Sequence, residues 1–124
     1  MISIVDDDQP VREATRNLIR SLGYVALTFT SAEEYLRSDR LHDTACLITD
    51  VMMPGMTGIE LQQRLIADGH RTPIIFMTAH PEEQIRGHAL GAGAVGFLSK
   101  PFDDDQLIQC IDRALQSDPP GLFG

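Results

Sequence analysis

Short runs of apolar and β-branched residues alternate with helical patterns along almost the whole sequence. The runs begin about every 21 to 28 residues, which is the spacing of consecutive strand–helix units. They cover residues 2–5, 24–29, 46–48, 73–77 and 95–98, and apolar residues recur at helical spacing in 10–22, 31–36, 59–66, 82–90 and 104–115. This alternation constrains the fold most strongly, because such units build a parallel sheet with right-handed crossovers and helices on both faces.

The predicted fold is an α/β doubly wound, five-stranded parallel sheet of strand order 2-1-3-4-5 with five helices. Its strands all point the same way, so polar residues that follow different strands gather at one edge. These residues are Asp6 and Asp7 after the first run, Asp50 after the third, Thr78 after the fourth and Lys100 after the fifth. Ligands of open α/β sheets bind at this edge. We therefore expect a functional site composed of these five side chains.

Asp50 is the residue around which the expected site is built. It follows the apolar run 46–48 and precedes a Pro54-Gly55 turn, so its carboxylate is exposed enough to react and fixed enough to be aimed. Three carboxylates close together raise one another's pKa, and a hard divalent cation such as Mg²⁺ offsets their charge. With an ammonium and a hydroxyl group opposite the cation, a phosphoryl group can be held while Asp50 attacks phosphorus and forms an aspartyl phosphate.

Charge and composition narrow the classes of function. The 124 residues include 18 acidic and 10 basic side chains, a formal net charge of −8, so the domain should repel nucleic acid and anionic lipid. No apolar stretch approaches the roughly 20 residues that span a bilayer, and no signal peptide opens the chain, so the expected location is the cytoplasm. Cys46 and Cys110 lack CxxC spacing and are expected to be buried free thiols.

Several residues receive a structural interpretation. Asp8 and Asp103 precede helical patterns and are expected N-caps, and the segment from Ser31 to Glu34 fits a capping box. The methionines are expected to pack against other residues. The histidines lack the i, i+4 spacing of a helical zinc pair and are expected at the surface. They are His42, His70, His80 and His88.

Four strings of residues stand in order at the expected strand ends. They are Val5-Asp6-Asp7 with Val11-Arg12, Asp50-Val-Met-Met-Pro54-Gly55-Met-Thr-Gly58, Met77-Thr78-Ala79, and Gly91-Ala-Gly-Ala94 leading to Phe97-Leu-Ser-Lys100-Pro101-Phe102. Together they resemble the receiver (REC) domain of bacterial two-component response regulators, and most closely those of the FixJ type. The resemblance implies a flavodoxin-like (CheY-like) fold for residues 1–117, with residues 118–124 as a C-terminal tail or truncated linker.

The resemblance also implies a phosphoacceptor module, whose only activities are self-phosphorylation and slow autodephosphorylation, and not an enzyme that turns over a substrate. Asp50 would accept a phosphoryl group from a phosphohistidine of a sensor histidine kinase. Asp7, Asp50 and the backbone carbonyl of Met52 would hold Mg²⁺, with Mn²⁺ as a substitute. Asp6 would act mainly through a metal-bound water.

Signalling would depend on residues around the phosphoryl group. Thr78 and Lys100 would bind its oxygens, Thr78 would move toward it, and Phe97 would turn inward as the switch residue. The resemblance also implies that the Lys100–Pro101 peptide bond is cis. The surface of the fourth helix, fifth strand and fifth helix, roughly residues 82–116, would control homodimerisation or binding to a downstream effector protein or a missing DNA-binding domain.

Two other classes of function stay open. A phosphatase of the haloacid-dehalogenase type also places an Asp at a strand exit, but it requires a second Asp two residues later, where this chain has Met52. A degenerate receiver that only docks or dimerises is opposed by the retention of all five polar residues.

Phe97 can also be a core residue rather than a switch. In the resembling family, the residues two beyond the phosphoacceptor and two beyond the conserved hydroxyl influence how long the phosphoryl group survives. Here they are Met52 and His80. Neither is an obvious aid to an attacking water, so we hypothesise a phosphorylated state that persists.

Overall fold

The computed structural model describes residues 1–116, which form five strands and five helices in strict alternation. The strands are β1 (Ile2–Val5), β2 (Ala26–Phe29), β3 (Cys46–Asp50), β4 (Ile74–Thr78) and β5 (Gly96–Ser99). The helices are α1 (Gln9–Ser21), α2 (Ala32–Arg37), α3 (Gly58–Ala67), α4 (Glu83–Gly91) and α5 (Asp104–Gln116). Residues 118–124, the expected tail, lie outside this description.

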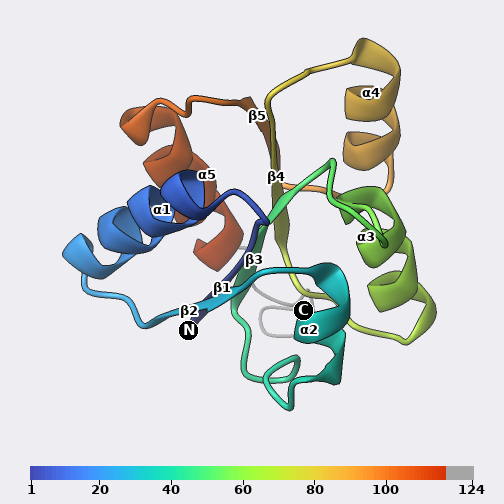
Figure 1. Cartoon of the computed structure of the whole chain (residues 1–124), viewed down its shortest axis with the longest axis horizontal. Coiled ribbons are helices and arrows are strands. Elements are labelled where there is room, and N and C mark those ends of the chain that lie inside the picture. Colours follow the sequence, from blue (N-terminus) through green and yellow to red (C-terminus); the bar gives the residue numbers. More distant parts are fainter. Residues whose placement is uncertain (117–124) are drawn as a thin grey trace.

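The strands form one parallel sheet in the order β2-β1-β3-β4-β5, as the sequence predicted. Helices α1 and α5 cover one face, and α2, α3 and α4 cover the other (Figure 1). Every residue of β1, β3 and β4 is buried, because helices lie on both sides of these strands. This burial explains why their sequences are continuous apolar runs rather than alternating patterns.

Each face of the sheet has its own apolar core. Leu47 and Ile48 are neighbours in β3 but belong to different cores, because successive side chains of a strand point to opposite faces. Leu47 shares its core with Leu61 of α3, whereas Ile48 shares the other with Ile19 of α1. The two cores fix the sheet between its helical layers and thereby hold the strand ends in register.

The predicted N-caps of α1 and α5 are confirmed. The Asp8 carboxylate accepts a hydrogen bond from the backbone N–H of Val11 at 3.5 Å. The Asp103 carboxylate accepts bonds from the N–H groups of Asp105 and Gln106 at 2.8 and 3.2 Å. Both aspartates therefore satisfy the free donors of a first helical turn, separately from the aspartates of the expected site.

The capping box predicted at Ser31 is only half formed. The Ser31 hydroxyl accepts a hydrogen bond from the Glu34 N–H at 3.0 Å, but the Glu34 carboxylate accepts one from the Thr30 hydroxyl at 2.8 Å. The complete box lies at the start of α3, where Thr57 and Glu60 exchange side-chain and backbone hydrogen bonds. A competing hydroxyl next to the cap explains why the sequence pattern was misleading at α2.

Helix α1 differs from the apolar face that its sequence pattern predicts, which consists of Val11, Ala14, Leu18, Ile19 and Leu22. Thr15 is buried beside Ile19, whereas Ala14 is exposed and Leu22 is 37% exposed. The Thr15 hydroxyl donates to the Val11 carbonyl at 2.7 Å, so this polar residue can face the sheet with its hydrogen bond satisfied. None of the helices formed by residues 1–116 has the length and hydropathy of a membrane span.

Candidate functional site at the carboxyl edge of the sheet

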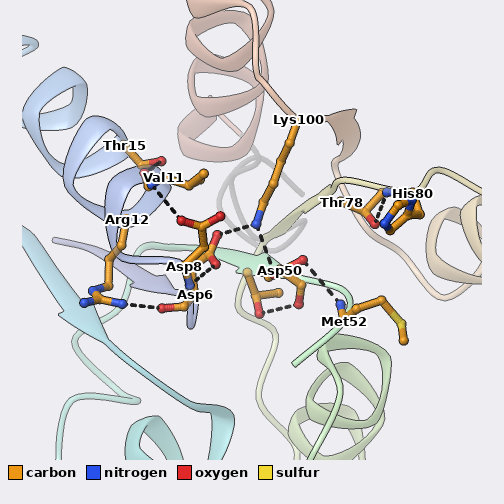
Figure 2. A network of polar contacts seen from close by, with 11 residues as sticks. Asp6, Asp8, Val11, Arg12, Thr15, Asp50, Met52, Thr78, His80 and Lys100 are labelled. Atoms are coloured by element: carbon orange, nitrogen blue, oxygen red, sulfur yellow. Dashed lines mark hydrogen bonds and ion pairs between the residues drawn. The ribbon is translucent and has the colours of Figure 1, made fainter. Parts of the chain in front are cut away.

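The carboxyl ends of the strands bring the predicted polar residues to one edge, as Figure 2 shows for most of them. Asp6 follows β1, Asp50 is the last residue of β3, Thr78 is the last residue of β4, and Lys100 follows β5. The backbone N–H of Lys100 donates to the Thr78 carbonyl at 2.8 Å, which continues the pairing of β4 and β5 past the end of β5. The sheet register therefore fixes where these side chains begin.

Lys100 lies between two carboxylates. Its Nζ is 2.9 Å from Asp6 Oδ2 and 3.1 Å from Asp50 Oδ2. The side chains of Lys100, Asp6 and Asp50 are only 9%, 1% and 7% exposed, so water screens these ion pairs weakly. The structure thus brings together residues that lie far apart in the sequence and builds a compact charged cluster from them.

Backbone hydrogen bonds hold the two buried carboxylates in place. Asp6 Oδ1 accepts from the Asp8 N–H at 2.9 Å, and Asp50 Oδ1 accepts from the Met52 N–H at 3.3 Å. The Arg12 guanidinium donates to the Asp6 carbonyl at 2.8 Å and so fixes the turn between β1 and α1. In the sequence, Arg12 stands out only as part of the Val11-Arg12 motif. A basic residue four positions after the N-cap Asp8, at the start of the helix that follows Asp6, is the sequence signal that could have indicated this contact.

The ionisation of the cluster reflects burial and charge together. Burial raises the pKa of Asp50; the Lys100 hydrogen bond lowers this pKa, and the nearby Asp6 carboxylate raises it, so the net direction is upward. Burial alone would lower the pKa of Lys100, but its contacts with Asp6 and Asp50 outweigh burial and raise it. Lys100 therefore stays charged at neutral pH, whereas ionising the Asp50 carboxyl in this cluster costs free energy.

Asp6, Asp7 and Asp50 can each offer one oxygen within 4.8 Å of the others. Such an all-oxygen set of carboxylates is the chemistry that a hard divalent cation prefers. In addition, Asp6 Oδ2 is buried and accepts no hydrogen bond from the described residues, although it is close to the Lys100 ammonium. The donor set and this free lone-pair capacity both fit a bound Mg²⁺.

The remaining predicted residues, Thr78, Phe97 and Met52, lie in three different environments. The Thr78 hydroxyl is buried and accepts a hydrogen bond from the His80 N–H at 3.2 Å, to one side of the carboxylates (Figure 2). Phe97 is half-buried against the core of α2, α3 and α4, with its ring centroid 6.2 Å from that of Phe76. The Met52 side chain is 58% exposed and extends away from Asp50 (Figure 2). The Lys100–Pro101 bond is cis, as the resemblance implied.

The loop from β3 to α3 is held by two contacts that the sequence analysis did not predict. A Cβ on Gly58 would collide with the backbone carbonyl of Asp50, so α3 begins directly against the end of β3. On the other side, Glu33 of α2 accepts a hydrogen bond from the Met56 N–H at 3.2 Å. Gly55 has a φ of +76°, a conformation that glycine adopts readily. These contacts fix the backbone that follows Asp50.

The parallel sheet of order β2-β1-β3-β4-β5, with carboxylates and a lysine at its carboxyl edge, defines a CheY-like α/β domain. The chain belongs to the response regulator receiver domain family, whose model matches residues 2–112. This membership places it in two-component phosphorelay signalling, as a module that signals rather than one that turns over a substrate.

Individual relatives agree with the FixJ-type resemblance. Nodulation protein W of Bradyrhizobium diazoefficiens is 38% identical over 118 residues, 95% of this chain and 52% of that protein. The solved structure of FixJ-N has a TM-score of 0.83 and 34% identity, over 95% of this chain and 94% of that one. The structure of the response regulator StyR has a TM-score of 0.86 and 44% identity, over 93% of this chain and 58% of that one. The chain spans about half the length of the curated relatives it matches.

Proposed function

We propose that this domain receives a phosphoryl group on Asp50 from a phosphohistidine of a sensor histidine kinase, in a reaction that requires Mg²⁺ or Mn²⁺. The observation that supports this most directly is the position of Lys100, whose ammonium lies 2.9 and 3.1 Å from the carboxylates of Asp6 and Asp50. A carboxylate beside a fixed ammonium and a cluster of oxygen ligands has the parts that phosphoryl transfer needs, which are mainly positioning and charge neutralisation.

The metal ion would be held by Asp7, Asp50 and the backbone carbonyl of Met52, with Asp6 acting mainly through a metal-bound water. When bound, it supplies positive charge that offsets the carboxylates and the oxygens of the phosphoryl group. The hydrogen bonds from the Asp8 and Met52 N–H groups keep the carboxylates of Asp6 and Asp50 aimed. The protein therefore supplies a preformed set of oxygens with little reorganisation.

In the proposed transfer, a carboxylate oxygen of Asp50 attacks phosphorus while the P–N bond of the phosphohistidine breaks. The electron pair of that bond stays on the kinase imidazole, which takes up a proton. Lys100 binds a phosphoryl oxygen after exchanging its contact with Asp50 for one with the new group. In the unphosphorylated domain, the Thr78 hydroxyl accepts a hydrogen bond from the His80 N–H at 3.2 Å. Thr78 gives up this bond to reach the phosphoryl group.

The phosphorylated domain would signal through the surface formed by α4, β5 and α5. We propose that the movement of Thr78 makes room for Phe97 to turn further inward. Thr78 is the last residue of β4, and Phe97 lies in the neighbouring strand β5. The changed surface would control homodimerisation, or contact with a downstream effector protein or a DNA-binding domain. Within the domain, α4 suits such a change because its N-cap residue Glu82 makes no side-chain capping bond.

The test is intact mass after incubation with Mg²⁺ and acetyl phosphate, a small phosphodonor. One hydroxylamine-labile phosphoryl group is expected on the wild type and none on Asp50→Asn. Asp43→Asn, an exposed aspartate at the opposite edge, is the matched control and should be phosphorylated normally. A folded, Mg²⁺-binding protein that neither acetyl phosphate nor a kinase can phosphorylate would refute the proposal and favour a docking module.

A further inference from the structure

The amino-terminal edge of the sheet, opposite the carboxylate cluster, brings two histidines into contact. His42 lies in the loop before β3, and His70 lies in the loop before β4. These strands are neighbours whose pairing begins at Leu47 and Ile74, so the loops that precede them meet. The imidazole centroids of His42 and His70 are 5.2 Å apart, with their planes inclined by 51°. Helical spacing could not reveal this pair, because the two residues come from different crossovers.

The separation of the rings matches that of two imidazoles on one metal ion. A zinc–nitrogen bond of about 2.0–2.1 Å puts the metal about 3.2 Å from each ring centre, and a tetrahedral angle of about 109° then puts the centroids about 5.2 Å apart. The observed separation is 5.2 Å. The centroid separation therefore fits one shared metal ion, provided that a nitrogen of each ring turns toward it.

The surroundings leave room for an ion and its waters. His42 and His70 line an open cavity of about 410 Å³ together with Thr44 and Asp68, and the His42 side chain is exposed. The Asp68 carboxylate is held by Arg64 at 3.0 Å. Within residues 1–116, only the aspartate cluster at the other edge gathers three or more carboxylate, imidazole or thiolate ligands. The remaining coordination positions at the histidine pair are therefore open to water.

The ligand type selects the class of metal. Imidazole nitrogen suits Zn²⁺, Cu²⁺ and Ni²⁺, whereas Mg²⁺ prefers the oxygens of the carboxylate cluster. We propose that His42 and His70 form a second metal site, for a divalent transition-metal ion such as Zn²⁺, which joins the α2–β3 loop to the α3–β4 loop. This site is independent of the proposed phosphorylation of Asp50.

Isothermal titration of the full chain with Zn²⁺, in excess Mg²⁺ to occupy the carboxylate cluster, tests the proposal. The wild type is expected to bind one Zn²⁺ per chain at the histidine pair. His42→Gln and His70→Gln should each weaken that binding at least about tenfold, since even the loss of a supporting outer-shell contact weakens metal sites by 10- to 100-fold. His88→Gln, an exposed histidine on α4, is the matched control and should keep the wild-type affinity.

NMR of the imidazole groups gives a second readout that needs no substitution. At one equivalent of Zn²⁺, the ring signals of His42 and His70 should shift together, while those of His80 and His88 stay in place. Unchanged zinc affinity in either glutamine variant would overturn the proposal. A shift confined to one ring of the pair, or one that appears instead at His80 or His88, would overturn it as well.

Discussion

The ionisation of Asp50 has a consequence for stability that depends on pH. Its pKa is raised by burial, lowered by the Lys100 hydrogen bond and raised by the Asp6 carboxylate, with a net rise. A carboxyl group of this kind contributes stability that is fully present below the pKa of the unfolded chain and is lost as the pH rises through the raised folded value. At neutral pH, ionised Asp50 therefore destabilises the metal-free fold.

Asp50→Asn is accordingly expected to increase the free energy of unfolding at neutral pH in Mg²⁺-free buffer. The gain should shrink as the pH falls below the usual pKa range of aspartate, where Asp50 is protonated in both states. Urea denaturation at a series of pH values measures both effects. Asp104→Asn, in the exposed first turn of α5, is the control and should show no gain. A wild type more stable than Asp50→Asn at neutral pH without Mg²⁺ would contradict the interpretation.

Met52, two residues after Asp50, is expected to affect the lifetime of the phosphorylated state. Its apolar side chain is 58% exposed and cannot orient a water molecule for attack on an aspartyl phosphate. Met52→Asn supplies an amide that can orient such a water, so we expect phosphoryl loss to be about tenfold faster. This increase is smaller than the roughly 10²- to 10⁴-fold acceleration that a positioned general acid or base provides. Loss of phosphoryl mass over time measures the rate, and Met52→Leu is the apolar control. Equal lifetimes in Met52→Asn and wild type would count against this role.

At the scale of secondary-structure elements, replacing two helical glycines by alanine is expected to change the free energy of unfolding in opposite directions. Gly58 starts α3 where a Cβ would collide with the Asp50 carbonyl, whereas a Cβ on Gly87 in α4 would meet nothing within 4 Å. Gly58→Ala is expected to lower the free energy of unfolding by about 1–3 kcal/mol and to slow phosphorylation. Gly87→Ala should raise it by about 0.5–1 kcal/mol. Urea denaturation compares the two, and an equal effect of both alanines would refute the packing argument.

Two side-chain hydrogen bonds join helix α4 to α3, in addition to the packing of α4 in the core. Gln62 is buried and donates to the Ala89 carbonyl at 3.1 Å, and Gln63 contacts His88 at 3.2 Å. Both glutamines come from one turn of α3, whose first residue packs against the end of β3 beside Asp50. A change at Asp50 therefore has a short physical connection to α4, through a single helix.

For the whole molecule, phosphorylation is expected to strengthen self-association through α4, β5 and α5. Acetyl phosphate with Mg²⁺ should increase dimer affinity by about 5- to 150-fold, the range of a typical coupling between two sites. Light scattering after size exclusion measures the dimer, and Asp50→Asn should stay unresponsive. Arg86→Glu on α4 should weaken the dimer, whereas Arg37→Glu on α2, another exposed helical arginine, should not. A phosphorylated monomer would leave effector binding as the output of the switch.

The sequence alone determined the fold class, the strand order and the polar residues that end the strands. It could do so because hydrophobic periodicity and caps such as Asp8 and Asp103 are local properties, and because parallel βα units admit few topologies. Its errors concern side-chain hydrogen bonds that hydrophobic periodicity does not describe. At Ser31 the Thr30 hydroxyl competes for the Glu34 carboxylate, and at Thr15 the hydroxyl donates to the Val11 carbonyl and so allows burial.

Which side chains meet in the folded chain depends on tertiary packing rather than on any local pattern. Lys100 contacts Asp6 and Asp50, while Thr78 turns its hydroxyl to the His80 backbone. At the opposite edge, the histidines of two separate loops approach to 5.2 Å. These contacts depend on register and on the packing of two crossovers against each other, and no periodicity within a single element records them. The sequence determined which strand end or loop carries each functional residue, and the packing determined which partners its side chain contacts.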